Sequence, residues 1–222
     1  MKRQIGLSVV VVLLTIADGA LKTLLVRHGG SHWALPGGAP QYDEPLQDAA
    51  ERVVRELLGK DVKYLEQLYT FGSTIPPDGQ RAVEVAYYGL VPTGLLELGQ
   101  QHDPAKINWF AVAEAPRLIT EHQQVVQVAQ DRLCGKLAYT AVGFELLADT
   151  FTLAELHKLY EVILGKQIDK RNFRKKVLSL NVLQEIGVGA TTQKGRGRPA
   201  KRYRFRPEVF QSIDTKRDIF QF

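Results

Sequence analysis

The sequence is poor in the residues that form covalent cross-links or bind soft metals, with one cysteine, one methionine and five histidines among 222 residues. The lone Cys134 excludes an intrachain disulfide, and it lacks the partner thiols of a structural zinc site or a redox dithiol. We therefore expect a reducing cytoplasm as the location of the protein, with Cys134 as a structural thiol.

The sequence also lacks an apolar run of the roughly 20 residues that a membrane span needs. The longest run, residues 5–17, ends at Asp18-Gly19, and a second run follows at residues 20–26. This pattern favours a β-hairpin over a signal peptide or a membrane anchor. A composition of 45% hydrophobic and 24% charged residues is ordinary for a globular protein, which excludes a disordered or collagen-like chain.

Hydrophobic patterning predicts an α+β domain in the first 120 residues. Beyond the hairpin, we expect strands at residues 62–72, 82–91 and 107–112, and a helical connector at residues 122–148. We also expect a helix at residues 45–58, which ends at Gly59. The predicted apolar face of this helix consists of Leu46, Ala49, Ala50, Val53 and Leu57.

Acidic residues become scarce toward the C-terminus. Residues 149–222 contain 16 Lys and Arg against 8 Asp and Glu, whereas residues 1–148 contain 13 and 16. Such an asymmetry indicates a nucleic-acid-binding segment, with a merely solvated basic surface as the alternative.

The basic segment has the pattern of a helix-turn-helix. Thr152 and Glu155 form a capping box that opens a helix at residues 153–164, and Asp169 is the expected N-cap of a second helix. In the second helix we expect Phe173, Val177 and Leu180 to face inward. Its outward residues are predicted to contact the major groove of double-stranded DNA, and they are Lys170, Arg171, Asn172, Arg174 and Lys175.

A wing is predicted after the second helix, with strands at residues 185–190 and 201–205. The tip between them reads Arg196-Gly197-Arg198-Pro199, which resembles the core of an AT-hook. Two arginines on such an extended chain fit the narrow minor groove of an A·T tract. The predicted DNA-binding residues of the wing are Lys194, Arg196, Arg198, Lys201 and Arg202. Contacts to phosphate alone remain the alternative.

Residues 38–59 resemble the Nudix box, with Gly38, Glu44, Arg52, Glu56 and Gly59 in the family spacing. In that family, box glutamates hold the magnesium that helps water attack a diphosphate. Two of these glutamates are replaced here, by Val53 and Leu57. We therefore predict no metal site, no catalytic residue and no hydrolase activity.

Two alternatives stay open for the box. Val53 and Leu57 could serve packing alone, which is compatible with the loss of activity. Carboxylates outside the box could replace the missing ligands, and the candidates are Asp61, Glu66, Glu84 and Glu114.

The full sequence resembles the Nudix-related transcriptional regulators of the NrtR family. Beyond the box, the matching motifs include Gln67-Leu-Tyr-Thr-Phe-Gly72, Lys170-Arg-Asn-Phe-Arg174 and Gly197-Arg-Pro-Ala-Lys-x-Tyr203. The resemblance implies a homodimeric repressor of genes for NAD synthesis or salvage, which leaves a palindromic operator when it binds ADP-ribose. One departure is Glu121-His122, where the family suggests an aspartate–histidine pair.

We thus expect a Nudix α/β/α sandwich at residues 1–148 for effector sensing and a winged helix at residues 149–222 for DNA binding. No cofactor is required, and ADP-ribose is the expected effector. The predicted effector-binding residues are Arg27, Trp33, Gly37, Gly38, Arg52, Glu56, Phe71 and His122. Three alternatives remain, namely an active ADP-ribose pyrophosphatase with an accessory DNA-binding domain, a regulator of sugar catabolism, and a DNA-binding protein indifferent to nucleotides.

Overall fold

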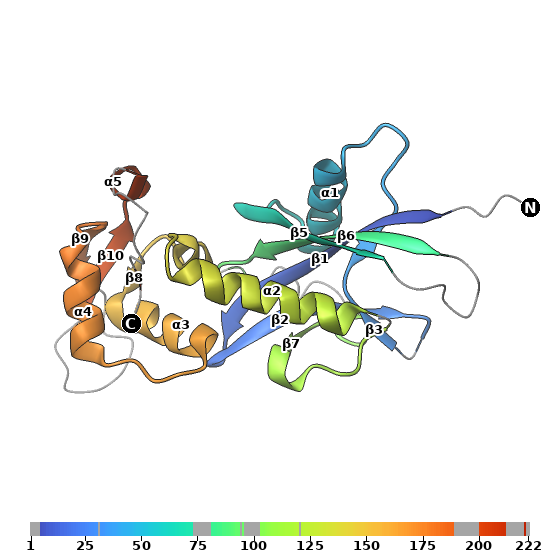
Figure 1. The fold of residues 1–222 in the computed structure, drawn as a ribbon. Helices are drawn as coiled ribbons and strands as arrows, with labels where there is room; N and C mark the ends of the chain where they lie inside the picture. Colours follow the sequence, from blue (N-terminus) through green and yellow to red (C-terminus); the bar gives the residue numbers. More distant parts are fainter. Residues whose placement is uncertain are drawn as a thin grey trace, which may run out of the picture. The chain divides into compact units, whose positions relative to one another are not determined.

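The computed structural model describes residues 5–30, 32–72, 81–93, 95, 103–119, 121–188, 200–211 and 220 (Figure 1). The chain divides into two compact units. Unit 1 comprises Met1–Val91 and Leu95–Arg132, and unit 2 comprises Pro92–Gly94 and Leu133–Phe222. One helix, α2 (His122–Leu137), carries the chain from unit 1 into unit 2.

The predicted hairpin forms the middle of the sheet in unit 1. β1 (Gly6–Ala17) and β2 (Ala20–His28) pair antiparallel, and the turn between them has φ values of 52° at Asp18 and 75° at Gly19. Asp-Gly suits such a turn, because both positions require a left-handed backbone. Residues 9–16 of β1 are buried on both faces, as expected for a central strand.

Within the described residues, seven strands form one mixed sheet with the order β3-β2-β1-β6-β5, in which β4 also pairs with β1 and β7 with β2. The further strands are β3 (His32–Ala34), β4 (Gly37–Gly38), β5 (Tyr64–Gly72), β6 (Ala82–Leu90) and β7 (Ile107–Ala111). β1 and β6 run parallel, and the other pairs are antiparallel. The three predicted strands after the helix are therefore confirmed.

The box helix α1 (Leu46–Leu58) covers one face of this sheet, where it packs on side chains such as Val9, Val11 and Val85. Gly59 ends α1 with a φ of 70°, as predicted. The predicted apolar face packs on the core but was incomplete. Val54 and Leu58 are buried, whereas Leu46 and Leu57 are only partly buried. A helix on a wide sheet buries both sides of its contact line, so the buried stripe is broader than one row of side chains.

α2 contacts side chains on the other face of the sheet. Its His122 and Arg132 meet Glu84 and Glu66, and Glu84 alternates along β6 with Val85, which packs under α1. The predicted helical connector at residues 122–148 consists of two helical segments. α2 ends at Leu137, and a 3₁₀ segment follows at Val142–Leu146. At the end of α2 the Thr140 hydroxyl and the Thr140 N–H both donate to the Lys136 carbonyl.

Unit 2 contains the predicted helix-turn-helix and part of the wing. Its elements are β8 (Phe151–Thr152), α3 (Leu153–Leu164), α4 (Lys170–Ser179), β9 (Leu183–Val188), β10 (Lys201–Phe205) and α5 (Pro207–Gln211). The three strands form a sheet in the order β8-β10-β9. Thr152 and Glu155 form the predicted capping box, and Gly165 ends α3 in the left-handed conformation.

An aromatic core holds unit 2 together. Phe144 stacks on Phe205 with ring centroids 4.1 Å apart, and Phe210 stacks on Phe220, whose N–H donates to the Ala138 carbonyl. In the part of the chain that the structure describes, no helix is long and apolar enough to cross a membrane.

Candidate functional site

The box begins where the chain passes close to the central strand. β4 pairs with β1, and a Cβ on Gly37 would lie 2.4 Å from the Val9 carbonyl oxygen. Only glycine fits at this distance. At Gly38, by contrast, a Cβ would meet no atom within 4 Å.

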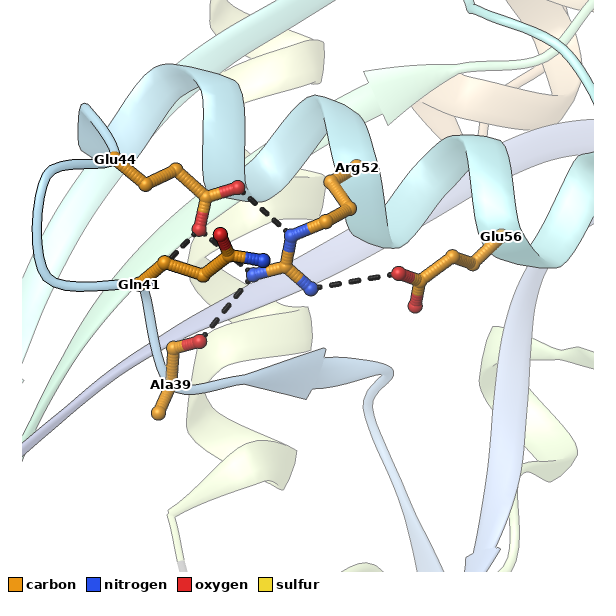
Figure 2. A network of polar contacts seen from close by, with 5 residues as sticks. All are labelled: Ala39, Gln41, Glu44, Arg52 and Glu56. Atoms are coloured by element: carbon orange, nitrogen blue, oxygen red, sulfur yellow. Dashed lines mark hydrogen bonds and ion pairs between the residues drawn. The ribbon is translucent and has the colours of Figure 1, made fainter.

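Arg52 lies among the box carboxylates that remain (Figure 2). Its Nε and Nη2 donate to the two oxygens of Glu44 at 2.7 and 2.8 Å, and Nη2 also donates to the Ala39 carbonyl at 3.3 Å. On the other side, Nη1 lies 3.5 Å from a Glu56 oxygen, one helical turn along α1. A single guanidinium therefore bridges both glutamates.

Glu44 is held as an anion by these contacts. Hydrogen bonds from Arg52 and from the Gln41 N–H lower the pKa of Glu44 from 4.5 to about 2. The Glu44 side chain is only 13% exposed, so its oxygens are directed into the loop rather than to solvent. They are thus occupied by internal donors.

The two replaced glutamates leave no polar group at their positions. Val53 is buried at 5% exposure in the core beneath α1, and Leu57 packs against the same core. Glu56 is 64% exposed and pairs with Arg52. Magnesium requires several free oxygen ligands in octahedral geometry, and this set does not fit it.

The candidate carboxylates outside the box contact other side chains or are exposed. Asp61 pairs with Arg55 at 2.8 Å, and Glu66 pairs with Arg132 at 3.1 Å. Glu84 lies 3.5 Å from a His122 nitrogen. Glu114 is exposed in a 3₁₀ turn at Val112–Glu114. Among the described residues, no three His, Cys, Asp or Glu side chains are grouped to hold a metal ion.

His122 is buried at 3% exposure and uses both of its ring nitrogens. Nδ1 accepts from the Leu35 N–H at 2.9 Å, so the hydrogen of a neutral ring is on Nε2, which faces Glu84. The ring thus joins the start of α2 to the backbone that enters the box at Pro36.

Two aromatic contacts accompany this segment. The Arg27 guanidinium lies 4.4 Å above the Trp33 ring, which is itself buried against Phe110. On β5, the buried Phe71 contacts the ring of Tyr69, which is 63% exposed. Tyr69 was not among the predicted residues, although it stands two positions before Phe71 on an edge strand.

The predicted effector residues therefore form three local groups. Arg27 and Trp33 are in contact, and so are Arg52 and Glu56. The third group runs through β6, because Phe71 is the strand partner of Glu84, which faces His122. Gly37 and Gly38 lie between the Trp33 strand and the box loop.

A second polar group links β5 to α2. Arg132 Nη1 donates to Glu66 Oε1 at 3.1 Å and Nη2 donates to the Leu68 carbonyl at 3.4 Å. Tyr64 donates to the other oxygen of Glu66, and the Tyr64 and Tyr88 hydroxyls are 2.8 Å apart. Burial raises the pKa of Tyr88 to about 12, so both hydroxyls keep their protons at neutral pH. Sequence reasoning assigned no role to Arg132.

The predicted recognition helix corresponds to α4. The Asp169 side chain caps it by accepting from the Asn172 N–H at 2.8 Å, as predicted. Phe173 and Val177 are buried, and Leu180 is partly buried at the end of the helix. The predicted DNA-contacting side chains are all exposed, namely Lys170, Arg171, Asn172, Arg174 and Lys175.

The turn before α4 is held by a buried histidine. His157 Nε2 lies 2.8 Å from the Ile168 carbonyl, and Glu161 accepts from the Ile168 N–H at 3.2 Å. The His157 ring also contacts the edge of Phe173. These bonds fix where α4 begins.

In the wing, two predicted DNA contacts are engaged within the protein. The Lys201 ammonium pairs with Glu185 at 2.8 Å. The Arg202 guanidinium is turned toward Thr150, with Nη2 2.5 Å from its carbonyl oxygen and Nε 3.2 Å from its hydroxyl. Lys194, Arg196 and Arg198 lie outside the described residues.

Both parts of the chain match known protein domains. Residues 6–129 match the NUDIX domain model, and residues 143–205 match the NrtR DNA-binding winged helix domain model. The ADPR responsive transcriptional repressor NtrR of Acinetobacter baylyi is 31% identical over 207 residues, which cover 90% of this chain and 81% of that protein.

Solved structures of similar proteins have the same fold. The Shewanella oneidensis NrtR complexed with a 27mer DNA is 32% identical, with a TM-score of 0.80 over 92% of this chain and 95% of that one. A MutT/nudix family protein from Enterococcus faecalis has a TM-score of 0.69 over 93% of this chain and 88% of that one, at 23% identity, and shows the likeness of fold alone. With a Nudix domain followed by a DNA-binding winged helix, the chain belongs to the NrtR family of Nudix-related transcriptional regulators.

Proposed function

We propose that this protein is a transcriptional repressor that binds ADP-ribose in its Nudix domain without hydrolysing it, and that binding releases DNA. The Arg52 network carries the proposal. In an active enzyme the box carboxylates face a divalent cation, whereas here the guanidinium of Arg52 donates to both oxygens of Glu44 and lies 3.5 Å from Glu56. The repressor relative of Acinetobacter baylyi, named for its response to ADPR, supports the choice of ligand.

The same network changes which arginine would meet the diphosphate of ADP-ribose. Two carboxylates already balance the charge of Arg52, which leaves little attraction for an anion. Arg27 is exposed above Trp33, close in sequence to the glycines of the box. We therefore assign the diphosphate contact to Arg27 before Arg52, with Gly38 as the point where the ligand meets the backbone.

Target genes follow from the ligand. ADP-ribose is a product of NAD turnover, so a repressor released by it would control genes of NAD synthesis or salvage. A twofold dimer on a palindromic operator would present two α4 helices to successive major grooves. A ligand shifts such an equilibrium only if it binds the two arrangements unequally, and a coupling of about 2–3 kcal/mol lowers operator affinity about 30- to 150-fold.

The test is to incubate the purified protein with ADP-ribose and magnesium and to measure both retained ligand and released AMP by chromatography. We expect retained ligand and no turnover. Operator DNA, selected from a random pool, should then dissociate when ADP-ribose is added. AMP release over many turnovers would instead make the protein a pyrophosphatase, and DNA binding indifferent to every nucleotide would remove the sensor role.

A further inference from the structure

Two side chains of α2 connect it to the two backbone segments that carry the candidate effector residues. At its first residue, His122 accepts from the Leu35 N–H, two residues before Gly37. About 15 Å further along the helix, at 1.5 Å per residue, Arg132 donates to the Leu68 carbonyl. Leu68 is the bulge residue directly before Tyr69, whose ring contacts Phe71.

Both connections reach well-held groups. His122 is buried, and its second nitrogen faces Glu84 at 3.5 Å. Arg132 also pairs with Glu66, whose other oxygen accepts from Tyr64. Each connection combines a backbone group with a carboxylate, and the carboxylate of Glu66 also contacts the hydroxyls of Tyr64 and Tyr88.

The rest of α2 lies in unit 2. Residues 133–137 continue the same helix, and there the Cys134 thiol donates to the Ile163 carbonyl of α3, the helix that precedes the recognition helix. A helix resists bending because every turn is hydrogen-bonded to the next. A displacement at either connection is therefore passed to the residues beyond it.

We propose that His122 and Arg132 are positioning residues through which α2 senses both segments of the effector site, one through Leu35 and one through Leu68. This inference rests on the proposed function, since it concerns how ligand binding reaches DNA. Neither residue needs to touch the ligand or the DNA. Their removal should therefore weaken the coupling between the two binding events more than either binding event by itself.

Arg132→Ala is the test, with Asp131→Ala as the matched control. Asp131 is the neighbouring residue of α2, and it accepts a hydrogen bond from Gln127 of the same helix at 3.0 Å. For each protein, calorimetry gives the Kd for ADP-ribose, and fluorescence anisotropy gives operator affinity with and without ADP-ribose.

For Arg132→Ala we expect both single affinities to stay within about threefold of wild type. The loss of operator affinity on adding ADP-ribose should fall below about tenfold, from the 30- to 150-fold expected of wild type. Asp131→Ala should respond as wild type does. Glu66→Gln removes the charge of the partner while keeping an acceptor, and combining it with Arg132→Ala should add little to the single effect.

The outcomes separate the two ideas. A wild-type protein that keeps its operator affinity in ADP-ribose overturns the proposed function and this inference with it. A wild-type response that Arg132→Ala reproduces in full, or that Asp131→Ala loses equally, overturns only the inference. If Arg132→Ala does not fold, Arg132→Lys replaces it, because lysine keeps the charge but lacks the guanidinium that reaches both Glu66 and Leu68. If Arg132→Lys and Glu66→Gln both respond to ADP-ribose as wild type does, the positioning role of Arg132 is refuted as well.

Discussion

Arginine has opposite uses in the box and in the recognition helix. In the box, Arg52 forms ion pairs with Glu44 and Glu56 and thereby fixes a loop. On α4, Arg171 and Arg174 are exposed and have no ion pair with any other described residue. Internal pairing removes charge from the surface, whereas unpaired charge attracts a polyanion. The box carboxylates are therefore paired with a cation of the protein itself, whereas the two arginines of α4 have no such pair among the described residues.

The largest expected effect is on DNA binding and would come from the exposed arginines of α4. Changing Arg171 and Arg174 together to Ala should weaken operator binding by about 2–6 kcal/mol, since each specific contact contributes about 1–3 kcal/mol. The salt dependence of binding should also become shallower. Anisotropy titrations at several salt concentrations measure both. Unchanged affinity would mean that α4 does not face the DNA.

The second prediction concerns the Nudix box. Val53→Glu would restore a box glutamate but place a carboxylate in the core under α1, where Val53 is 5% exposed. We expect the free energy of unfolding to fall by about 2–4 kcal/mol, without AMP release from ADP-ribose. Urea denaturation and the AMP assay measure these. Val53→Ile is the control for volume, and full stability of Val53→Glu would show that the core opens there.

The third prediction concerns the tip of the wing. Arg198→Ala should cost about 1–3 kcal/mol on operators with an A·T tract if the arginine enters the minor groove. The matched comparison is the same operator with the tract replaced by G·C pairs, on which the substitution should have a smaller effect. An equal loss on both sequences would assign Arg198 to phosphate.

The smallest effect is the pH dependence of the Arg52 pair. The pKa of Glu44 falls from 4.5 to about 2 in the folded protein, so its contribution to stability is full above pH 4.5 and is lost as the pH falls toward 2. Arg52→Ala should destabilise the protein at pH 7 and lose less stability on acidification than wild type. Urea unfolding at pH 7, 4 and 3 tests this. Parallel curves for the two proteins would mean that Glu44 does not depend on Arg52.

Sequence reasoning succeeded where neighbours in the chain determine structure. The Asp18-Gly19 turn, the Thr152–Glu155 capping box and the Asp169 cap each depend on groups within a few residues of one another. The spacing of the box likewise predicted the Nudix domain, which the match over residues 6–129 confirms. The site residues Lys194, Arg196 and Arg198 stay predictions, since they lie outside the described residues.

Sequence reasoning was incomplete where segments distant in the chain meet in space. The side of α1 that is buried depends on the shape of the sheet below it, so Val54 and Leu58 were missed. Arg202 stays a predicted DNA contact, but sequence reasoning did not foresee that its guanidinium lies on Thr150, 52 positions earlier in the chain. A basic residue on a strand carries no sequence signal for such a partner.

The sequence by itself determined the two-part organisation, the family and the apolar substitutions in the box, because these follow from periodicity, caps and motif spacing. Only the tertiary structure decided that Arg52 lies between Glu44 and Glu56, that Val53 belongs to the core, and that His122 and Arg132 connect α2 to the sheet. The reason is physical. A charge is neutralised, and an apolar group is buried, by whatever lies within a few ångströms of it in space, and the packing of the sheet brings those groups together from positions far apart in the chain.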